Sequence, residues 1–148
     1  MFLKSVPGAD PAASRRRKMK VFIADDSRLV QERLATILNQ LEGVEIVGQA
    51  QTAPEAISAI QSLKPEVVIL DIRMPGGTGI DVLRAIKQAR PAPVAIILTN
   101  FPYWEYRQTC LKAGADFFFD KSSEFDKIPQ VFERLQRGPT TGQTSRLD

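Results

Sequence analysis

Five side chains that could handle a phosphoryl group stand at the ends of short apolar runs in the sequence. Three are carboxylates, one is a hydroxyl and one is an ammonium: Asp25, Asp26, Asp71, Thr99 and Lys121. An aspartate can act as a nucleophile and carry an acyl phosphate. Neighbouring carboxylates repel one another unless a cation joins them, and their oxygens suit Mg²⁺. These residue types predict magnesium-assisted phosphoryl transfer if the fold brings them together.

Asp71 is the centre of this prediction. It follows the apolar, largely β-branched run 67–70, and Pro75 and three glycines within 76–79 come after it. Such a run is typical of a strand covered on both faces in a parallel sheet, whose carboxyl end is where these sheets bind ligands. For this segment alone, an aspartate that caps the following turn is the simpler interpretation. The other carboxylates and Lys121 favour chemistry instead.

Segments typical of strands and helices alternate five times along the chain. We expect strands at 20–24, 45–50, 66–70, 94–99 and 116–120, and helices over 27–41, 53–63, 80–90, 103–113 and from 126 onward. Thr52 with Glu55 predicts a capping box, and Asp126 is expected to cap the last helix, where Pro129 falls in the first turn. Short right-handed crossovers then predict a three-layer α/β fold with a doubly wound, parallel five-stranded sheet. All five functional groups would lie on one rim of that sheet.

Composition excludes several other kinds of site. The 148 residues contain no histidine, which excludes imidazole-based triads, histidine metal sites and a phosphohistidine carrier. The single cysteine, Cys110, cannot form an internal disulfide and is expected to be a buried thiol. No apolar run is long enough to span a bilayer, and the N-terminus lacks the apolar core of a signal peptide. A cytoplasmic protein is expected.

The net charge of +3 comes from the N-terminus. Residues 1–18 hold five basic side chains and one acidic one, which leaves 15 basic and 16 acidic side chains in 19–148. We expect a disordered basic leader (1–18), one folded domain (19–137) and a flexible tail (138–148). The basic run 15–18 could bind nucleic acid or anionic lipid weakly, could be solvated, or could precede an alternative start at Met19.

The acidic pair 25–26, Asp71 with its following Met-Pro and Gly79, Thr99 and Lys121 occur in order and at domain-wide spacing. Over about 19–137 this set resembles the receiver domain of bacterial two-component response regulators. The resemblance implies a flavodoxin-like strand order, 2-1-3-4-5, and a histidine kinase or histidine phosphotransfer protein as phosphoryl donor.

From charge, we expect Asp71 to be the phosphoacceptor, Asp25 and Asp26 to hold Mg²⁺ beside it, and Lys121 and Thr99 to contact phosphoryl oxygens. By comparison with the family, Arg73, two residues after Asp71, would add its backbone carbonyl to the metal ligands. The resemblance also implies a switch: Thr99 moves toward the phosphoryl group, and Phe118 turns inward. This would remodel the partner-binding face built by the fourth helix, fifth strand and fifth helix. Phe118 could equally be an ordinary core residue.

Some positions depart from the commonest family pattern. Ser122 replaces the usual proline after Lys121, and Asn100 replaces a small residue after Thr99. We expect Arg73 and Phe101 to tune the lifetime of the acyl phosphate. Three further aromatic residues could form an exposed partner or dimer surface, or could simply pack on their helix: Tyr103, Trp104 and Tyr106.

Three functions compete. The first is a stand-alone receiver, since only eleven residues follow Arg137, that catalyses only its own phosphorylation and dephosphorylation and is not otherwise an enzyme. The second is a Mg²⁺-dependent aspartyl-phosphate phosphatase, although Arg73 stands where its general acid would be expected. The third, a regulator that binds DNA directly, is disfavoured by the near-neutral folded part. A homodimer is left open.

Overall fold

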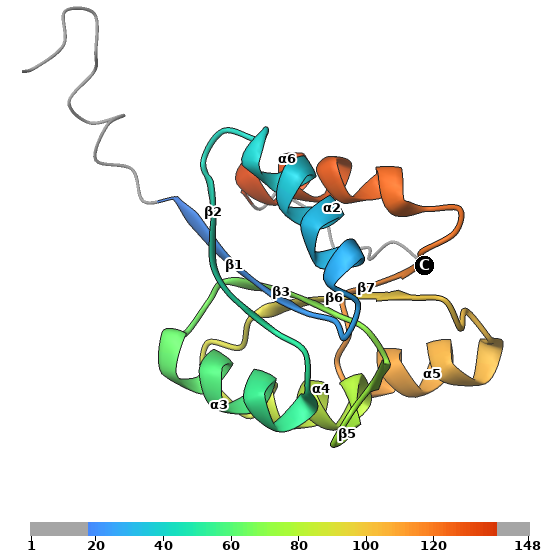
Figure 1. Cartoon of the computed structure of the whole chain (residues 1–148). Coiled ribbons are helices and arrows are strands. Elements are labelled where there is room, and N and C mark those ends of the chain that lie inside the picture. The colour runs from blue at the N-terminus through green and yellow to red at the C-terminus, as the bar shows by residue number, and fades with distance from the viewer. Residues whose placement is uncertain (1–17, 139–148) are drawn as a thin grey trace, which may run out of the picture.

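The computed structural model describes residues 18–138 (Figure 1). Of the expected leader and tail, only Lys18 and Gly138 fall within this range. The predictions made for residues 1–17 and 139–148 therefore lie outside the described residues. Among the helices of the described range, none combines the length and the apolar character needed to cross a bilayer.

The centre of the fold is a five-stranded parallel sheet in the order β2-β1-β3-β6-β7. Its strands are β1 (Met19–Ala24), β2 (Val44–Ala50), β3 (Val67–Leu70), β6 (Val94–Thr99) and β7 (Phe117–Asp120). Numbered along the chain within this sheet, the order is 2-1-3-4-5, which confirms the flavodoxin-like topology. The three central strands are almost entirely buried, as their continuous apolar runs predict.

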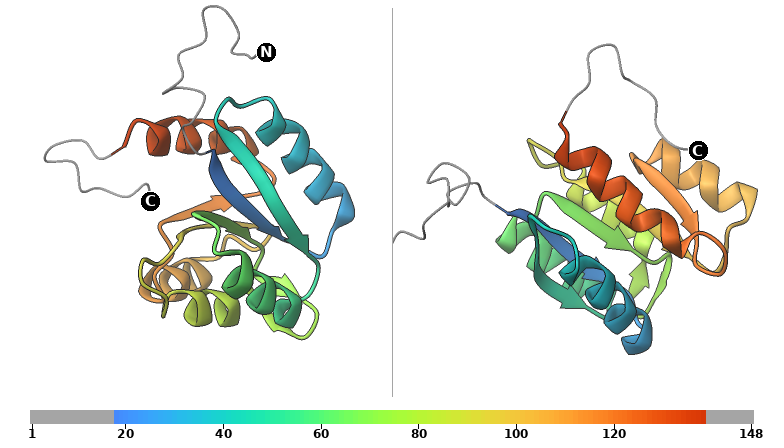
Figure 2. Two further views of the ribbon diagram at one scale, coloured as in Figure 1. Left: turned by 90° about the vertical axis from the view of Figure 1, so that its left-hand side faces the viewer. Right: turned by 90° about the horizontal axis from the view of Figure 1, so that it is seen from above.

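Helices cover both faces of the sheet, and Figure 2 shows the resulting three layers from two further directions. One face carries α2 (Arg28–Asn39) and α6 (Ile128–Gln136). The other carries α3 (Ala53–Leu63), α4 (Gly79–Ile86) and α5 (Trp104–Lys112). Alternate strand residues supply two cores: Phe22 and Ala24 face the three-helix side, and Val21 and Ile23 face the two-helix side.

A small hairpin after Asp71 was not predicted. The expected glycine loop contains two short antiparallel strands, β4 (Arg73–Met74) and β5 (Gly77–Thr78). The backbone amide of Ala53 donates to the carbonyl of Pro75 at 3.0 Å, which ties the hairpin to the start of α3. Two-residue strands carry no periodic pattern, because only their pairing defines them.

The helix starts differ partly from expectation. Thr52 caps α3, but the Glu55 carboxylate accepts from the amide of Gln51 rather than of Thr52, so the predicted capping box is incomplete. A complete box, unpredicted, opens α4 between Thr78 and Asp81.

The start of α6 and the end of α4 also differ from the predicted positions. The prediction that Asp126 caps the last helix was wrong, since it lies inside a 3₁₀ turn, η1 (Phe125–Lys127). A cap at Asp126 would accept from the amide two or three residues on, but the amide of Ile128 donates to the carbonyl of Phe125 and Pro129 has no amide hydrogen, so α6 starts without a side-chain cap. The helix over 80–90 ends earlier than expected, at Ile86.

Candidate functional site

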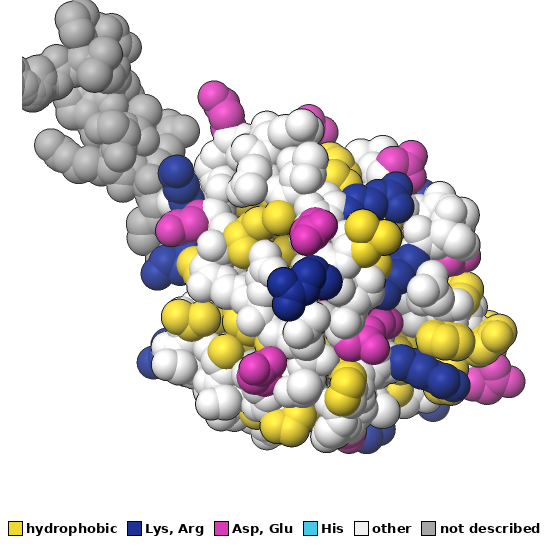
Figure 3. All heavy atoms as spheres, in the orientation of Figure 1, with side chains coloured by type: hydrophobic (Ala, Val, Ile, Leu, Met, Phe, Trp, Pro, Cys, Tyr) yellow, Lys and Arg dark blue, Asp and Glu magenta, His cyan; other side chains and the backbone are white. Residues whose placement is uncertain are grey.

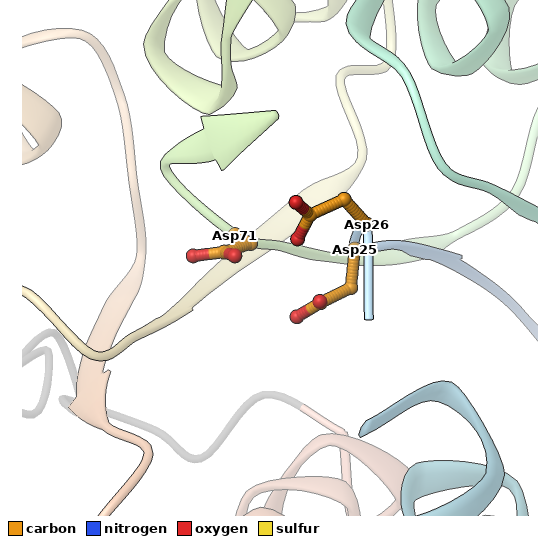
Figure 4. Close-up of side chains that lie close together, drawn as sticks. All are labelled: Asp25, Asp26 and Asp71. Carbon is orange, nitrogen blue, oxygen red and sulfur yellow. The ribbon is translucent and has the colours of Figure 1, made fainter. Parts of the chain in front are cut away.

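The three aspartates come together at the carboxyl edge of the sheet. Asp25 and Asp26 follow β1, and Asp71 follows the neighbouring strand β3. One carboxylate oxygen from each lies within 4.8 Å of those of the other two. Figure 4 shows the three side chains next to one another, with their carboxylates pointing to the same side. The parallel register of β1 and β3 brings them together, because both strands end at the same height.

Lys121 completes this cluster from the end of β7, on the far side of β6. Its Nζ lies 2.7 Å from Asp25 Oδ2 and 3.1 Å from Asp71 Oδ2, and all three side chains are buried. The backbone amide of Lys121 donates to the carbonyl of Thr99 at 2.8 Å, which fixes where its side chain starts. The lysine therefore bridges a nucleophile candidate and a metal-ligand candidate.

Burial dominates the electrostatics of these groups. It raises the pKa of the Asp71 carboxyl, the charge of Asp25 raises it further, and the Lys121 ammonium opposes both. Burial likewise raises the pKa of Asp25 against the bond from Lys121. Burial works to lower the pKa of Lys121, but its bond to Asp25 and the charges of Asp71 and Asp25 outweigh that effect, so the pKa is raised. These shifts favour the charged form of the lysine and disfavour the charged forms of the two buried acids.

The donor set fits a divalent cation. The three carboxylates carry three negative charges when ionised, and the Lys121 ammonium neutralises one of them, so the cluster has a net charge of two negative units. Carboxylate oxygens are hard ligands, and Mg²⁺ commonly takes one or two of them together with water and phosphate oxygens. Asp26 is exposed, which leaves the cluster open on one side. Arg73 follows Asp71 by two residues, and the role of its backbone carbonyl as a ligand stays a prediction.

The backbone of Asp71 is held in place by Gly79, the first residue of α4. The amide of Gly79 donates to the carbonyl of Ile72 at 2.7 Å. A Cβ at Gly79 would lie only 2.0 Å from the carbonyl oxygen of Asp71, so no side chain fits there. The amide of Ile72 in turn donates to Asp71 Oδ1 at 2.8 Å. The close approach of α4 thus fixes the position from which the Asp71 side chain extends.

Gln31 is a site residue that the sequence analysis did not identify. It is buried in α2, and its Nε2 donates to the carbonyls of Asp25 at 2.8 Å and Ala50 at 2.9 Å. The available signal was a polar residue on an apolar helical stripe, three and seven positions before Leu34 and Leu38, which are buried on the same helix. The carboxylate of Asp25 is also fixed, because its Oδ1 accepts from the amide of Ser27 at 2.8 Å.

Thr99 is the last residue of β6 and is fully buried. Its Oγ1 accepts a hydrogen bond from the amide of Phe101 at 3.0 Å. The Phe101 ring carries the Arg73 guanidinium, whose central carbon lies 4.3 Å from the ring centre. Thr99 and Arg73 are therefore linked through one residue of the loop before α5.

Phe118 lies in β7 with 2% of its surface exposed, within the core beneath α3, α4 and α5. The guanidinium carbon of Arg107 in α5 lies 5.5 Å from its ring centre. The structure thus places Phe118 in a packed position, and its switch role stays a prediction.

The loop after Lys121 lacks the proline that is usual in the family. Asp120, the last residue of β7, holds this loop instead, because its Oδ1 accepts from the amide of Ser122 at 2.9 Å and from the hydroxyl of Ser122 at 2.8 Å.

The aromatic residues before and in α5 are partly exposed. Tyr103 is 58% exposed and Trp104 70%, whereas Tyr106 is half-buried and packs against the core. The ring centres of Tyr103 and Tyr106 are 5.9 Å apart. In the orientation of Figure 3, hydrophobic and basic side chains lie together on the surface at the right, where Figure 1 places α5. Ordinary packing accounts for Tyr106 but not for Trp104.

Comparisons with known proteins agree with this fold and identify the family. The response regulator receiver domain family matches residues 21–133. The isolated REC domain of RcsB from Salmonella enterica serovar Typhimurium, solved with the phosphomimetic BeF₃⁻, is 28% identical, with a TM-score of 0.76 over 84% of this chain and 92% of that one. The response regulator domain of Thermotoga maritima CheB is 27% identical, with a TM-score of 0.72 over 82% and 96% of the two chains.

Among curated proteins, the transcriptional regulatory protein YvfU of Bacillus subtilis, whose function is uncharacterised, is 32% identical over 120 residues. That alignment covers 81% of this chain and 60% of YvfU. The chain therefore spans well under the full length of this curated relative.

Proposed function

Because the chain belongs to the response regulator receiver domain family, we propose that Asp71 accepts a phosphoryl group from a phosphohistidine and thereby switches a partner-binding face. Membership of this family supports a histidine kinase or a histidine phosphotransfer protein as the donor. The observation that carries this proposal is the gathering of three carboxylates and Lys121 at one edge of the sheet.

In the proposed step, a carboxylate oxygen of Asp71 attacks the phosphorus atom of the phosphohistidine. A P–O bond forms, the P–N bond breaks, and the bonding electrons return to the imidazole of the donor, which takes up a proton. Asp71 must be ionised to attack, and the Lys121 ammonium at 3.1 Å favours that form against the burial of the site. The product is an acyl phosphate on Asp71.

Lys121 and Thr99 are suited to contact the transferred group. The ammonium of Lys121 has three donors, so it can bind a phosphoryl oxygen while it stays near Asp25. The Thr99 oxygen accepts from the amide of Phe101, which leaves its own hydroxyl proton for another acceptor. Phosphoryl transfer depends mainly on alignment and charge neutralisation, so these two donors support it without further covalent machinery.

Asp25, Asp26 and Asp71 would hold Mg²⁺, together with the backbone carbonyl of Arg73. When bound, the ion supplies positive charge that neutralises phosphoryl oxygens beside Asp71. The two residual negative charges of the cluster support this assignment. Lys121 lies between Asp25 and Asp71 and offsets part of their negative charge.

The output is proposed to pass through the face of α5, β7 and α6 to a downstream protein. Thr99 at the end of β6 and Phe118 in β7 would move when the phosphoryl group arrives. The exposed rings of Tyr103 and Trp104 support a protein contact at α5, since aromatic side chains are enriched in interaction hot spots. A contact with a second copy of this chain could use the same rings. Direct DNA binding is not proposed, because residues 19–148 hold 15 basic and 16 acidic side chains.

The test is incubation with acetyl phosphate and Mg²⁺, followed by intact-protein mass spectrometry. We expect at most one added phosphoryl group per chain, stable in acid and labile in base, that is absent in Asp71→Asn. The matched control is Asp126→Asn, which changes an exposed aspartate in the 3₁₀ turn and should leave the adduct intact. An adduct that persists in Asp71→Asn would overturn the proposal.

The same experiment distinguishes the proposed receiver from the alternative, a Mg²⁺-dependent phosphatase with Asp71 as nucleophile. A phosphatase would release many equivalents of inorganic phosphate without accumulating an adduct. The proposed receiver catalyses only its own phosphorylation and dephosphorylation, so phosphate release should follow the decay of the adduct. The family match to receiver domains favours this second outcome.

A further inference from the structure

Gln31 is the one buried polar residue of the described chain that the proposed reaction does not use. The other four buried polar or charged side chains are Asp25, Asp71, Thr99 and Lys121. Gln31 is 6% exposed and lies in the first turn of α2, on the face that further along carries Leu34 and Leu38. An apolar residue would be expected at such a position.

The side-chain amide of Gln31 joins the carboxyl ends of two strands. Its Nε2 has two hydrogens, and the two acceptors are the carbonyl of Asp25, after β1, and the carbonyl of Ala50, at the end of β2. The carbonyl of Ala50 also accepts from the amide of Asp25 at 3.0 Å. The bond to the carbonyl of Asp25 holds the peptide between Asp25 and Asp26, where the chain leaves the sheet, and the two bonds to the carbonyl of Ala50 connect this point to the end of β2.

The orientation of that peptide decides where two carboxylates point. Asp25 Oδ1 is already held by the amide of Ser27, but the exposed Asp26 has a side chain whose direction depends on its own backbone. The carbonyl of Asp26, which belongs to the following peptide, accepts a long contact of 3.5 Å from Nε2 of Gln51 within the described part of the chain. The short hydrogen bond that the carbonyl of the Asp25–Asp26 peptide accepts therefore comes from Gln31, at 2.8 Å.

We propose that Gln31 is a positioning residue for the cation site, holding the Asp25–Asp26 peptide so that both carboxylates face Asp71. The inference rests on the proposed function, because it assumes that these carboxylates bind a divalent ion. Groups that orient metal ligands without touching the metal commonly change metal affinity by about 10- to 100-fold when they are removed. Gln31 acts on the backbone of the ligands, so the lower end of that range is expected.

The test compares Mg²⁺ affinity in the wild type and in Gln31→Met, which keeps the length and the burial of the side chain but removes both hydrogen-bond donors. The affinity is read from the shift of the Ser27 amide in an NMR titration with Mg²⁺ alone. We expect about 10-fold weaker binding. The initial rate of phosphorylation by acetyl phosphate should fall at low Mg²⁺ and recover at saturating Mg²⁺.

The matched control is Leu38→Ala, which weakens the same helix two turns away from the site. It should lower the melting temperature and leave the Mg²⁺ affinity unchanged. A purely structural Gln31 would behave in the same way, with a lower melting temperature and an unaltered affinity, and that result would overturn the inference. Should Gln31→Met not fold, Gln31→Asn is measured instead, since it keeps the donors on a side chain too short to reach both carbonyls in their present positions.

The two proposals fail in different ways. If the wild type itself shows no Mg²⁺-dependent shift and no adduct on Asp71, the proposed function is wrong. If the wild type binds Mg²⁺ and is phosphorylated while the Gln31 variant binds Mg²⁺ equally tightly, only the role of Gln31 is wrong.

Discussion

The guanidinium carbon of Arg73 lies 4.3 Å from the centre of the Phe101 ring, which joins the hairpin after Asp71 to the loop after β6. The same Phe101 donates its amide to the Thr99 hydroxyl oxygen. The stack therefore stands between two segments that border the proposed phosphorylation site. Its ring and guanidinium would restrict the approach of water to an acyl phosphate on Asp71.

We expect the acyl phosphate to hydrolyse faster when this stack is removed. A cation–π contact at an exposed site is worth about 0.5–1 kcal/mol. If loss of the stack lowers the activation free energy of hydrolysis by that amount, the rate increases by about two- to fivefold. The measurement is the decay of phosphorylated Arg73→Ala/Phe101→Ala after removal of acetyl phosphate. Arg137→Ala, an exposed arginine at the end of α6, is the control. An unchanged decay rate in the double variant would rule out a role for the stack.

Asp71→Asn should stabilise the protein at neutral pH in the absence of divalent ions. Burial raises the pKa of Asp71 above that of the unfolded chain, so its contribution to stability is present at low pH and is lost as the pH rises through the folded-state pKa. An asparagine avoids that loss because its amide stays neutral, and we expect a gain on the order of 1 kcal/mol in the free energy of unfolding. Denaturant unfolding with EDTA at pH 7 and near pH 4 should show a gain for the variant at pH 7 that shrinks at the lower pH.

Added Mg²⁺ should reverse this difference, because it stabilises the wild type and has fewer ligands in Asp71→Asn. The exposed Asp126→Asn should change stability little at either pH. A variant less stable than the wild type at pH 7 in EDTA would show that the bond from Lys121 outweighs burial.

Gly79→Ala should be strongly destabilising, because its Cβ would lie 2.0 Å from the carbonyl oxygen of Asp71 and neither backbone can move freely. Overpacked sites typically cost about 1–3 kcal/mol, and a clash between backbones belongs at the upper end. Chemical denaturation measures the change. The adjacent Thr78→Ala removes the cap of α4 and should cost only about 1 kcal/mol. Equal costs for the two variants would contradict the close contact.

Cys110 should be inert in the folded protein. It is fully buried, and burial raises the pKa of its thiol to about 11. Because only the thiolate reacts, a disulfide reagent at pH 8 should modify the native protein only at the rate of unfolding. In denaturant the single cysteine should react completely. Rapid stoichiometric reaction of the native protein would mean that α5 opens readily from the sheet.

Much of the architecture could be predicted from local patterns. The apolar run 94–99 corresponds to the whole of β6, and Gly43 and Gly114 lie just beyond helix-like segments, both with positive φ. The hairpin of β4 and β5 could not be predicted in this way, because each strand has two residues and exists only through its partner. The wrong cap at Asp126 has a similar cause: whether a turn begins as 3₁₀ or α depends on which carbonyl the next amide meets.

Gln31 shows the same limit within the site. Its position in the sequence marks it as polar on an apolar stripe, but one of its two acceptors, the carbonyl of Ala50, is 19 residues away. Nothing local identifies that carbonyl as the partner. The bond appears only when α2 packs over the ends of β1 and β2.

The period of the apolar residues and their order along the chain were enough to establish the alternation of strands and helices, and to show which chemical group follows each strand. The folded chain was needed to show that Lys121, 50 residues beyond Asp71, bridges it to Asp25 within 3.1 Å, and that Gln31 holds the adjoining peptide. Such distances are set by the register of parallel strands and by the helices that connect them. Those connections place groups far apart in the chain at one edge of the sheet.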